Sequence, residues 1–288
     1  AIMARFCHAV GVEMERVDVA PLFAPLHREL IQLLRSLSDD AWNRPTVAGK
    51  WRVRDVAAHL LDGMLRKLAA HRDGHLLRAG HSPPRTYDDV VTLINSLNAT
   101  GVTYGERLST RLLVDLLEVT GAWLSDFMAT LDPTARALFP VSWAGETESQ
   151  NWMDTGREYT EHWHHQMQIR EAAGAPLLLD DVWYEPLMSL SVRALPRTYA
   201  EVPAAVGTSI NLRVDDRAWA WCLVREGDAW HLYSGAAAKP AASIQIRRTD
   251  AWRLFYNALD APEAESILRI EGDRSLGIRL IAARSVMV

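Results

Sequence analysis

Residues 158–174 read EYTEHWHHQMQIREAAG, and this stretch places Glu161 and His165 four residues apart. On a helix, side chains at that spacing lie one turn apart on the same face. A carboxylate and an imidazole in that arrangement can hold one divalent metal ion together. We expect one long helix over residues 151–174, with Gly174 as its C-cap. The stretch therefore predicts a helix that contributes two metal ligands.

A third ligand has to come from another part of the chain. The best candidate is His59, which lies in WRVRDVAAHLLDG (residues 51–63) on a helix expected over residues 51–70. Three ligands from two helices, with positions left open for water or substrate, are typical of a catalytic metal site. Two imidazoles and a carboxylate suit zinc best, with nickel or iron also compatible.

The spacing of residues 158–174 does not select one ligand pair. Glu158 and His162 are also four residues apart, and His162 and His165 are three apart, so each pair could chelate a metal. His164 lies on a different face from Glu161. A helical wheel leaves no single apolar face, so it does not say which histidine points inward. A solvated polar face that carries several histidines is the simpler alternative.

Two aspartates flank His59 at helical spacing. A ligand histidine usually donates its second ring N–H to a carboxylate or a carbonyl. Asp55 and Asp62 lie four residues before and three residues after His59, so either could accept this bond. A capping or surface role fits both aspartates equally well.

The overall composition bounds the class of protein. The chain has 288 residues, a formal net charge of −5 and a pI of about 6.1, with no basic stripe, which argues against a nucleic-acid partner. Its two cysteines, Cys7 and Cys222, are far apart, so we expect no disulfide framework and a reducing compartment, the cytoplasm. No apolar run is long enough to span a bilayer, and the N-terminus lacks a signal-peptide pattern. We expect a monomer or a small homo-oligomer.

Hydrophobic periodicity divides the chain into two parts. Helices are expected over residues 19–37, 51–70, 87–98, 107–131 and 151–174, with loops or turns at 74–85 and 139–150. Residues 181–201 are expected to form a join. Beyond it, strands are expected at 210–214, 218–224, 229–234, 243–248 and 268–273, and helices at 249–260 and 274–286. The pattern predicts a two-domain α+β protein, with an all-helical domain over residues 1–180 and a small α/β domain over 181–288.

Two segments resemble motifs of a known family. WRVRDVAAHLLDG is similar to the W-x-V-R-D-x-x-A-H-L segment of the DinB-like, mycothiol-dependent maleylpyruvate isomerase family, and EYTEHWHHQMQIREAAG resembles its second motif, E-x-x-x-H-x-x-D-[IL]-x-x-A-x-G. The resemblance covers residues 19–175. It implies a four-helix bundle that binds a divalent metal, usually zinc, through His59, Glu161 and His165. One departure is Gln168, which stands where the family usually has an aspartate.

The C-terminal part resembles the sterol-carrier-protein-type domain that often follows this bundle. SIQIRRTDAWRLFYNALD and LRIEGDRSLGIRLI carry this likeness. In the family, the C-terminal domain supplies a basic residue to the active site, and Arg274 or Arg279 is the candidate for that role. An ordinary solvated helix face is the alternative for both arginines.

The resemblance implies a metal-dependent enzyme. Its metal would activate a low-molecular-weight thiol such as mycothiol for addition to an electrophilic small acid, giving a cis–trans isomerase or a thiol S-transferase, and an arginine would hold the substrate carboxylate. A metal-dependent hydrolase that uses bound water is one alternative. Another is a non-catalytic small-molecule or lipid-binding protein with a structural metal, for which His162 could be a fourth ligand.

Two further features are open to two interpretations each. Residues 75–106 could form a lid or a plain connection. The tryptophans near the motif segments could line a pocket or fill the core; they are Trp51, Trp143, Trp152 and Trp163.

Overall fold

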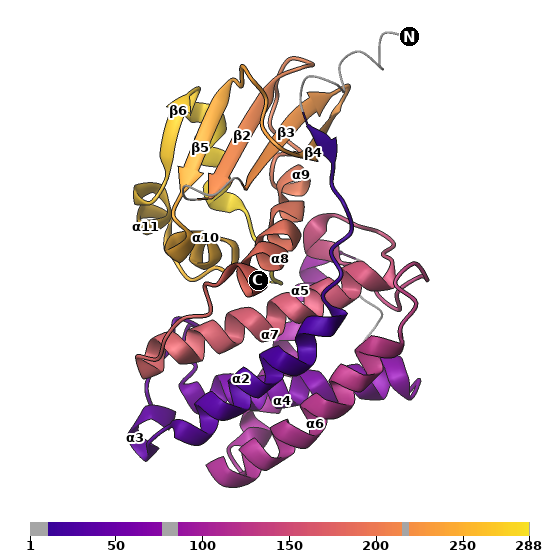
Figure 1. Ribbon diagram of the computed structural model, residues 1–288, viewed down its shortest axis with the longest axis vertical. Helices are drawn as coiled ribbons and strands as arrows, with labels where there is room; N and C mark the ends of the chain where they lie inside the picture. Colours follow the sequence, from indigo (N-terminus) through magenta and orange to yellow (C-terminus); the bar gives the residue numbers. More distant parts are fainter. Residues whose placement is uncertain (1–10, 77–85, 215–218, 288) are drawn as a thin grey trace.

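The computed structural model describes residues 11–76, 86–214 and 219–287. Helices form the N-terminal part, and a mixed six-stranded sheet with helices forms the C-terminal part (Figure 1). The α+β fold class expected from the sequence is confirmed. Cys7 and most of the predicted loop at 74–85 lie outside the described residues.

The N-terminal part is built around four long helices. The helical segments, in chain order, are η2 (Ala20–Leu22), α2 (Phe23–Ser36), α3 (Asp39–Trp42), α4 (Val53–Lys67), η3 (Leu68–Arg72), α5 (Tyr87–Gly105), α6 (Thr110–Thr130), η4 (Ser142–Ala144) and α7 (Asn151–Ala173). Helices α2, α4, α6 and α7 pack together, and α5 packs against α4. Leucines at helical spacing fill the inner face of α2, and Leu26, Leu30 and Leu34 are almost fully buried there.

Helix α7 lies between the rest of the bundle and the C-terminal part (Figure 1). It contacts α2 and α4 on one side and α8 (Asp181–Ser191) on the other. Trp163 of α7 packs edge-to-face on Trp252, with ring centroids 6.0 Å apart. The helix is therefore buried almost all round, which explains why a helical wheel shows no single apolar face. Gly174 ends it with a φ of 70°, as expected for a glycine C-cap.

The C-terminal part holds the sheet. Its strands are β2 (Ser209–Val214), β3 (Ala220–Glu226), β4 (Ala229–Ser234), β5 (Ala242–Ile246) and β6 (Arg269–Gly272), joined at one edge by β1 (Val12–Glu13). The order is β1-β4-β3-β2-β5-β6. Strands β2, β3 and β4 form the expected antiparallel meander, and β5 returns beside β2 in parallel. The accompanying helices are η5 (Val192–Ala194), α9 (Leu195–Thr198), α10 (Arg248–Phe255), α11 (Ala261–Ser266), α12 (Arg274–Gly277) and η6 (Ile278–Ala282).

Several expected elements differ from those observed. Helix α5 continues to Gly105, past the expected end at residue 98, because its later turns pack on α4. The join at 181–201 is largely helical and packs on α7. Helix α10 ends at Phe255 instead of residue 260, and Asn257 beyond it takes a left-handed φ of 55° that no helix allows. The expected helix at 274–286 is only a short α12 followed by the 3₁₀ segment η6.

One hydrophobic core runs through both parts of the chain. It joins α2, α4, α6 and α7 to α8, to the sheet and to α10 without a break. The domain boundary at residue 180 therefore stays a prediction. Among the helices that the structure describes, none has both the length and the apolar character needed to cross a membrane.

Candidate metal centre

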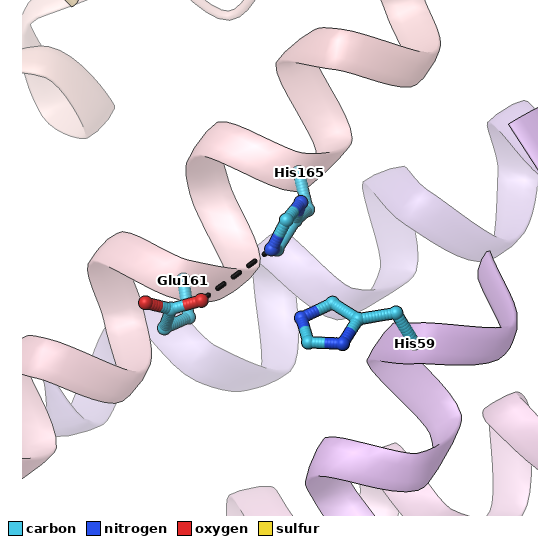
Figure 2. A group of neighbouring side chains, drawn as sticks. All are labelled: His59, Glu161 and His165. Carbon is cyan, nitrogen blue, oxygen red and sulfur yellow. Dashed lines mark ion pairs between the residues drawn. The ribbon is translucent and has the colours of Figure 1, made fainter. Parts of the chain in front are cut away.

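Helices α4 and α7 bring the three expected ligands together. His59 of α4 and Glu161 and His165 of α7 each offer one ligand atom, and these atoms all lie within 4.8 Å of one another. Figure 2 shows one ring nitrogen of His59 pointing toward the Glu161–His165 pair. On α7, His165 Nε2 is 3.4 Å from Glu161 Oε2, as the four-residue spacing implies.

The protonation states expected at this cluster suit metal binding. Burial, helped by the neighbouring His165, lowers the pKa of His59 well below its usual value, so His59 is neutral near pH 7. Burial by itself raises the pKa of the Glu161 carboxyl, but the imidazoles of His165, His164 and His59 hold that pKa well below its usual value. A neutral imidazole and an ionised carboxylate are the forms that bind a metal. Two imidazoles and one carboxylate fit zinc and leave coordination positions open.

Gln168 orients one of the histidines. His165 Nδ1 donates a hydrogen bond to Gln168 Oε1 at 2.8 Å, which leaves Nε2 free to face Glu161 and His59. The glutamine thus provides an acceptor where the related family usually has an aspartate. Both side chains are buried, so this bond fixes the ring of His165.

Within the described residues, the two aspartates that flank His59 form no hydrogen bond or ion pair with its ring. Asp55 accepts hydrogen bonds from the backbone and side chain of Arg52, and Asp62 accepts one from Arg66. His59 Nδ1 is buried and has no hydrogen-bond partner among the described residues. The idea that Asp55 or Asp62 orients His59 was therefore wrong, and the capping and surface roles apply instead.

Aromatic rings surround the cluster. Trp51 lies over His59, with ring centroids 4.9 Å apart and planes tilted by 40°. Tyr256, from the C-terminal part, stacks on His164 at 4.5 Å with nearly parallel planes, and His164 in turn lies 4.0 Å from His165. The Tyr256 hydroxyl also bonds Ser191 at 2.7 Å. The C-terminal part therefore touches the helix that carries two of the three ligands.

The other ligand pairs that the spacing allowed are engaged elsewhere. Glu158 Oε1 is 2.8 Å from Arg157 Nη2, and the ring of His162 packs edge-to-face on Phe23 at 5.7 Å. The metal-ligating clusters found within the described residues include neither Glu158 nor His162. His162 is thus not placed as a fourth ligand.

A buried ionic cluster lies along the same face of α7, toward its N-terminus. Lys67 Nζ is 2.5 Å from Asp154 Oδ2 and 3.6 Å from Glu158 Oε1, and Arg157 bonds Asp154 at 2.7 Å. His71 Nδ1 lies 3.6 Å from Asp154. The sequence patterns described above did not predict this cluster. Its signal was the spacing of residues 154, 158, 161 and 165 on one helical face.

The arginines and tryptophans singled out from the sequence lie in different settings. Arg274 is exposed on α12 and pairs with Glu265, and Arg279 is exposed on η6. No hydrogen bond or ion pair between described residues joins either arginine to the three ligands. Trp143 and Trp163 fill the core, Trp152 packs under Arg193, and only Trp51 borders the ligand cluster.

Comparisons with solved structures agree with the fold. A crystal structure of the mycothiol-dependent maleylpyruvate isomerase shares 13% sequence identity with this chain. The alignment covers 82% of this chain and 86% of the isomerase chain, with a TM-score of 0.52. The crystal structure of a histidine-to-alanine mutant of that isomerase shares 12% sequence identity with this chain. The alignment covers 88% of this chain and 91% of the mutant chain, with a TM-score of 0.52. At such identities the likeness shows the fold alone. A ubiquinone synthesis protein, UbiJ-SCP2, covers 34% of this chain with a TM-score of 0.25, which is too low to support the sterol-carrier resemblance.

The sequence comparison identifies the family. A search of curated proteins finds no significant match. The sequence profile described as "Mycothiol maleylpyruvate isomerase N-terminal domain" matches residues 23–170, more than half of the chain. The matched span runs from the start of α2 almost to the end of α7 and contains His59, Glu161 and His165. The chain belongs to the mycothiol maleylpyruvate isomerase N-terminal domain family.

Proposed function

We propose that this protein is a metal-dependent enzyme that activates a low-molecular-weight thiol for addition to an electrophilic small acid. Its reaction would be a cis–trans isomerisation of the kind named in the related structures, or an S-transfer. One observation carries the proposal: His59, Glu161 and His165 converge within 4.8 Å from two helices of the matched family region. We propose zinc as the metal and mycothiol or an analogue as the thiol.

The residues of the chain have separable tasks in this proposal. His59, Glu161 and His165 hold the metal, which when bound lowers the pKa of a thiol so that thiolate forms near neutral pH. Gln168 keeps the His165 ring in the orientation that the site needs. Trp51 covers one side of His59. These tasks require no catalytic cysteine, and Cys222 is buried in the sheet.

A cation is needed to hold the carboxylate of an acidic substrate. Arg274 and Arg279 keep this role as a prediction from the family resemblance. Arg157 is a further candidate, because it lies one helical turn before Glu161 on α7 and its side chain is 25% exposed. Two of its nitrogens bond Asp154, which fixes the guanidinium in place. The KM for the acid, measured in alanine variants of each arginine, tells the three candidates apart.

The geometry supports a catalytic metal better than a structural one. Structural zinc sites are almost always closed by four protein ligands. The cluster found within the described part of the chain offers three, and His162 packs away on Phe23. The number of ligands does not separate thiol from water as the nucleophile, so that choice rests on experiment.

The test uses zinc-loaded protein, mycothiol and maleylpyruvate, with cis-to-trans conversion followed by NMR. We expect conversion that needs both the metal and the thiol, and that is lost on chelation and in Glu161→Gln. The His162→Gln variant is the matched control, because it changes a buried polar residue of the same helix outside the cluster. Metal-dependent turnover that continues without thiol would support a hydrolase instead. No turnover of any small unsaturated acid by zinc-loaded protein with thiol would contradict the proposal.

A further inference from the structure

Helix α6 carries a row of large apolar side chains that face solvent. Leu112, Leu116, Val119 and Trp123 are 44%, 38%, 48% and 50% exposed. They follow one another at spacings of four, three and four residues, so they form one stripe on a single face of the helix. We call these four residues the α6 stripe. Figure 1 shows α6 at the outer edge of the bundle.

The stripe is not part of the hydrophobic core. A different face of α6 supplies the core residues Leu113, Leu117 and Leu124, which are almost fully buried, and α6 packs on α2 and α4. An amphipathic surface helix normally presents polar residues to water. A contiguous apolar face of this kind on a soluble protein marks an interaction surface.

The spacing of the stripe fits a second copy of the same chain. The pattern of four, three and four residues reads the same in both directions. When two α6 helices lie antiparallel, Leu112 therefore faces the partner's Trp123, and Leu116 faces the partner's Val119. A two-fold dimer requires such a self-complementary surface.

Charges beside the stripe favour the antiparallel arrangement. Arg111 and Asp126 flank the stripe on the same side, near opposite ends, and neither forms an ion pair within the part of the chain that the structure describes. In an antiparallel pair, Arg111 lies about two residues, or roughly 3 Å along the axis, from the position opposite the partner's Asp126. In a parallel pair, Arg111 and the partner's Asp126 would lie 15 residues, or roughly 22 Å along the axis, apart and could not pair.

The remaining charges on this flank are partly neutralised within each chain. Asp115 and Glu118 lie near the middle of the stripe, where two antiparallel copies would bring them close. Arg35 of α2 is 2.5 Å from Glu118 and 3.9 Å from Asp115. Each copy thus brings a counter-charge to the centre of the contact.

From the stripe and its flanking charges, we propose that the protein forms a symmetric dimer through antiparallel packing of α6 on α6 of a second copy. This inference does not depend on the proposed catalytic function. The partner is a second copy of this chain, because the apolar spacing and the pairing of Arg111 with Asp126 are both self-complementary.

Sedimentation velocity of the full chain across micromolar concentrations tests the dimer. We expect a species of twice the 32.3 kDa chain mass. Leu116→Glu and Val119→Glu should each give a monomer, because each variant places a charge in the apolar contact. The matched control is Val206→Glu, since Val206 is 73% exposed on the C-terminal part, away from the stripe. Thermal unfolding of each variant confirms that the fold is retained.

A charge exchange tests the orientation. Arg111→Glu and Asp126→Arg should each raise the dissociation constant about tenfold or more, and the double variant should recover wild-type affinity. A wild-type protein that stays monomeric at every concentration would overturn the proposal. So would a dimer that survives both glutamate substitutions in the stripe. Failure of the double variant to recover affinity would rule out the antiparallel pairing.

Discussion

Replacing Gln168 with alanine should weaken metal binding without removing a ligand. The variant loses the 2.8 Å hydrogen bond that His165 Nδ1 donates to Gln168 Oε1. Both side chains are buried, at 6% and 4% exposure, so water does not readily replace the lost acceptor. Leaving a buried donor unpaired costs about 1–3 kcal/mol. Removal of a residue that orients a ligand typically lowers metal affinity by about 10- to 100-fold, and this equals roughly 1.4–2.8 kcal/mol. The cost of an unpaired buried donor and the expected loss of zinc-binding free energy are therefore of the same size.

The assay is a zinc titration in competition with a chromophoric chelator. Gln166→Ala is the matched control, because Gln166 is also a buried glutamine of α7 but bonds Leu26 and Arg170 instead of a ligand. We expect Gln166→Ala to lower the free energy of unfolding and leave the zinc affinity unchanged. Gln168→Glu keeps an acceptor and should bind zinc at least as tightly as the wild type. Equal zinc affinities for Gln168→Ala and the wild type would refute the role given to Gln168.

Three further variants test the packing and the buried charges. Gly121→Ala would place a Cβ 2.1 Å from the buried ring of His27. The free energy of unfolding measured in urea should therefore fall by about 1–3 kcal/mol. An unchanged value would contradict the packing of α2 on α6. Asp154→Asn leaves the buried Lys67 without its closest counter-charge, so the free energy of unfolding in urea should fall by about 3 kcal/mol. A decrease below about 1 kcal/mol would mean that the ionic cluster is well solvated. Burial lowers the pKa of His71 to about 4, so between pH 4 and 6.5 the unfolded chain binds more protons than the folded chain, and His71 costs stability as the pH falls through that window. The His71→Gln variant should therefore lose up to about 3 kcal/mol of the pH dependence of the free energy of unfolding. An unaltered pH profile would show that His71 is not buried as described.

The sequence was most informative where a pattern depends on local spacing. The four-residue interval between Glu161 and His165 fixed their common face before any tertiary contact was known. Alternating strands separated by glycine and aspartate gave the meander of β2, β3 and β4. Selecting Glu161 and His165 over Glu158 and His162 needed the family resemblance, because α7 is buried almost all round and its periodicity carries no inward direction.

Features that depend on contacts between distant segments were out of reach. Lys67 meets Asp154 only after α4 packs on α7, so neither residue stood out in its own segment. Strand β1 has two residues and exists because Val12 and Glu13 pair with β4. The last turns of α5 are held by close packing, since Gly105 approaches Ala58 so tightly that a Cβ would lie 2.3 Å from it. The spacing of Asp154 and Glu158 on α7 was visible in the sequence, but their contact with Lys67, the strand β1 and the last turns of α5 left no periodic signal.

The most direct test of the metal centre is the metal content of the purified protein by elemental analysis. Wild type, His59→Ala, Glu161→Ala and the control His162→Ala are compared after zinc loading, with the fold of each checked by circular dichroism. We predict one equivalent of zinc in the wild type and in His162→Ala, and its loss from folded His59→Ala and Glu161→Ala. A wild-type protein that holds no metal after loading, or folded His59→Ala and Glu161→Ala variants that keep one equivalent, would contradict the proposed site.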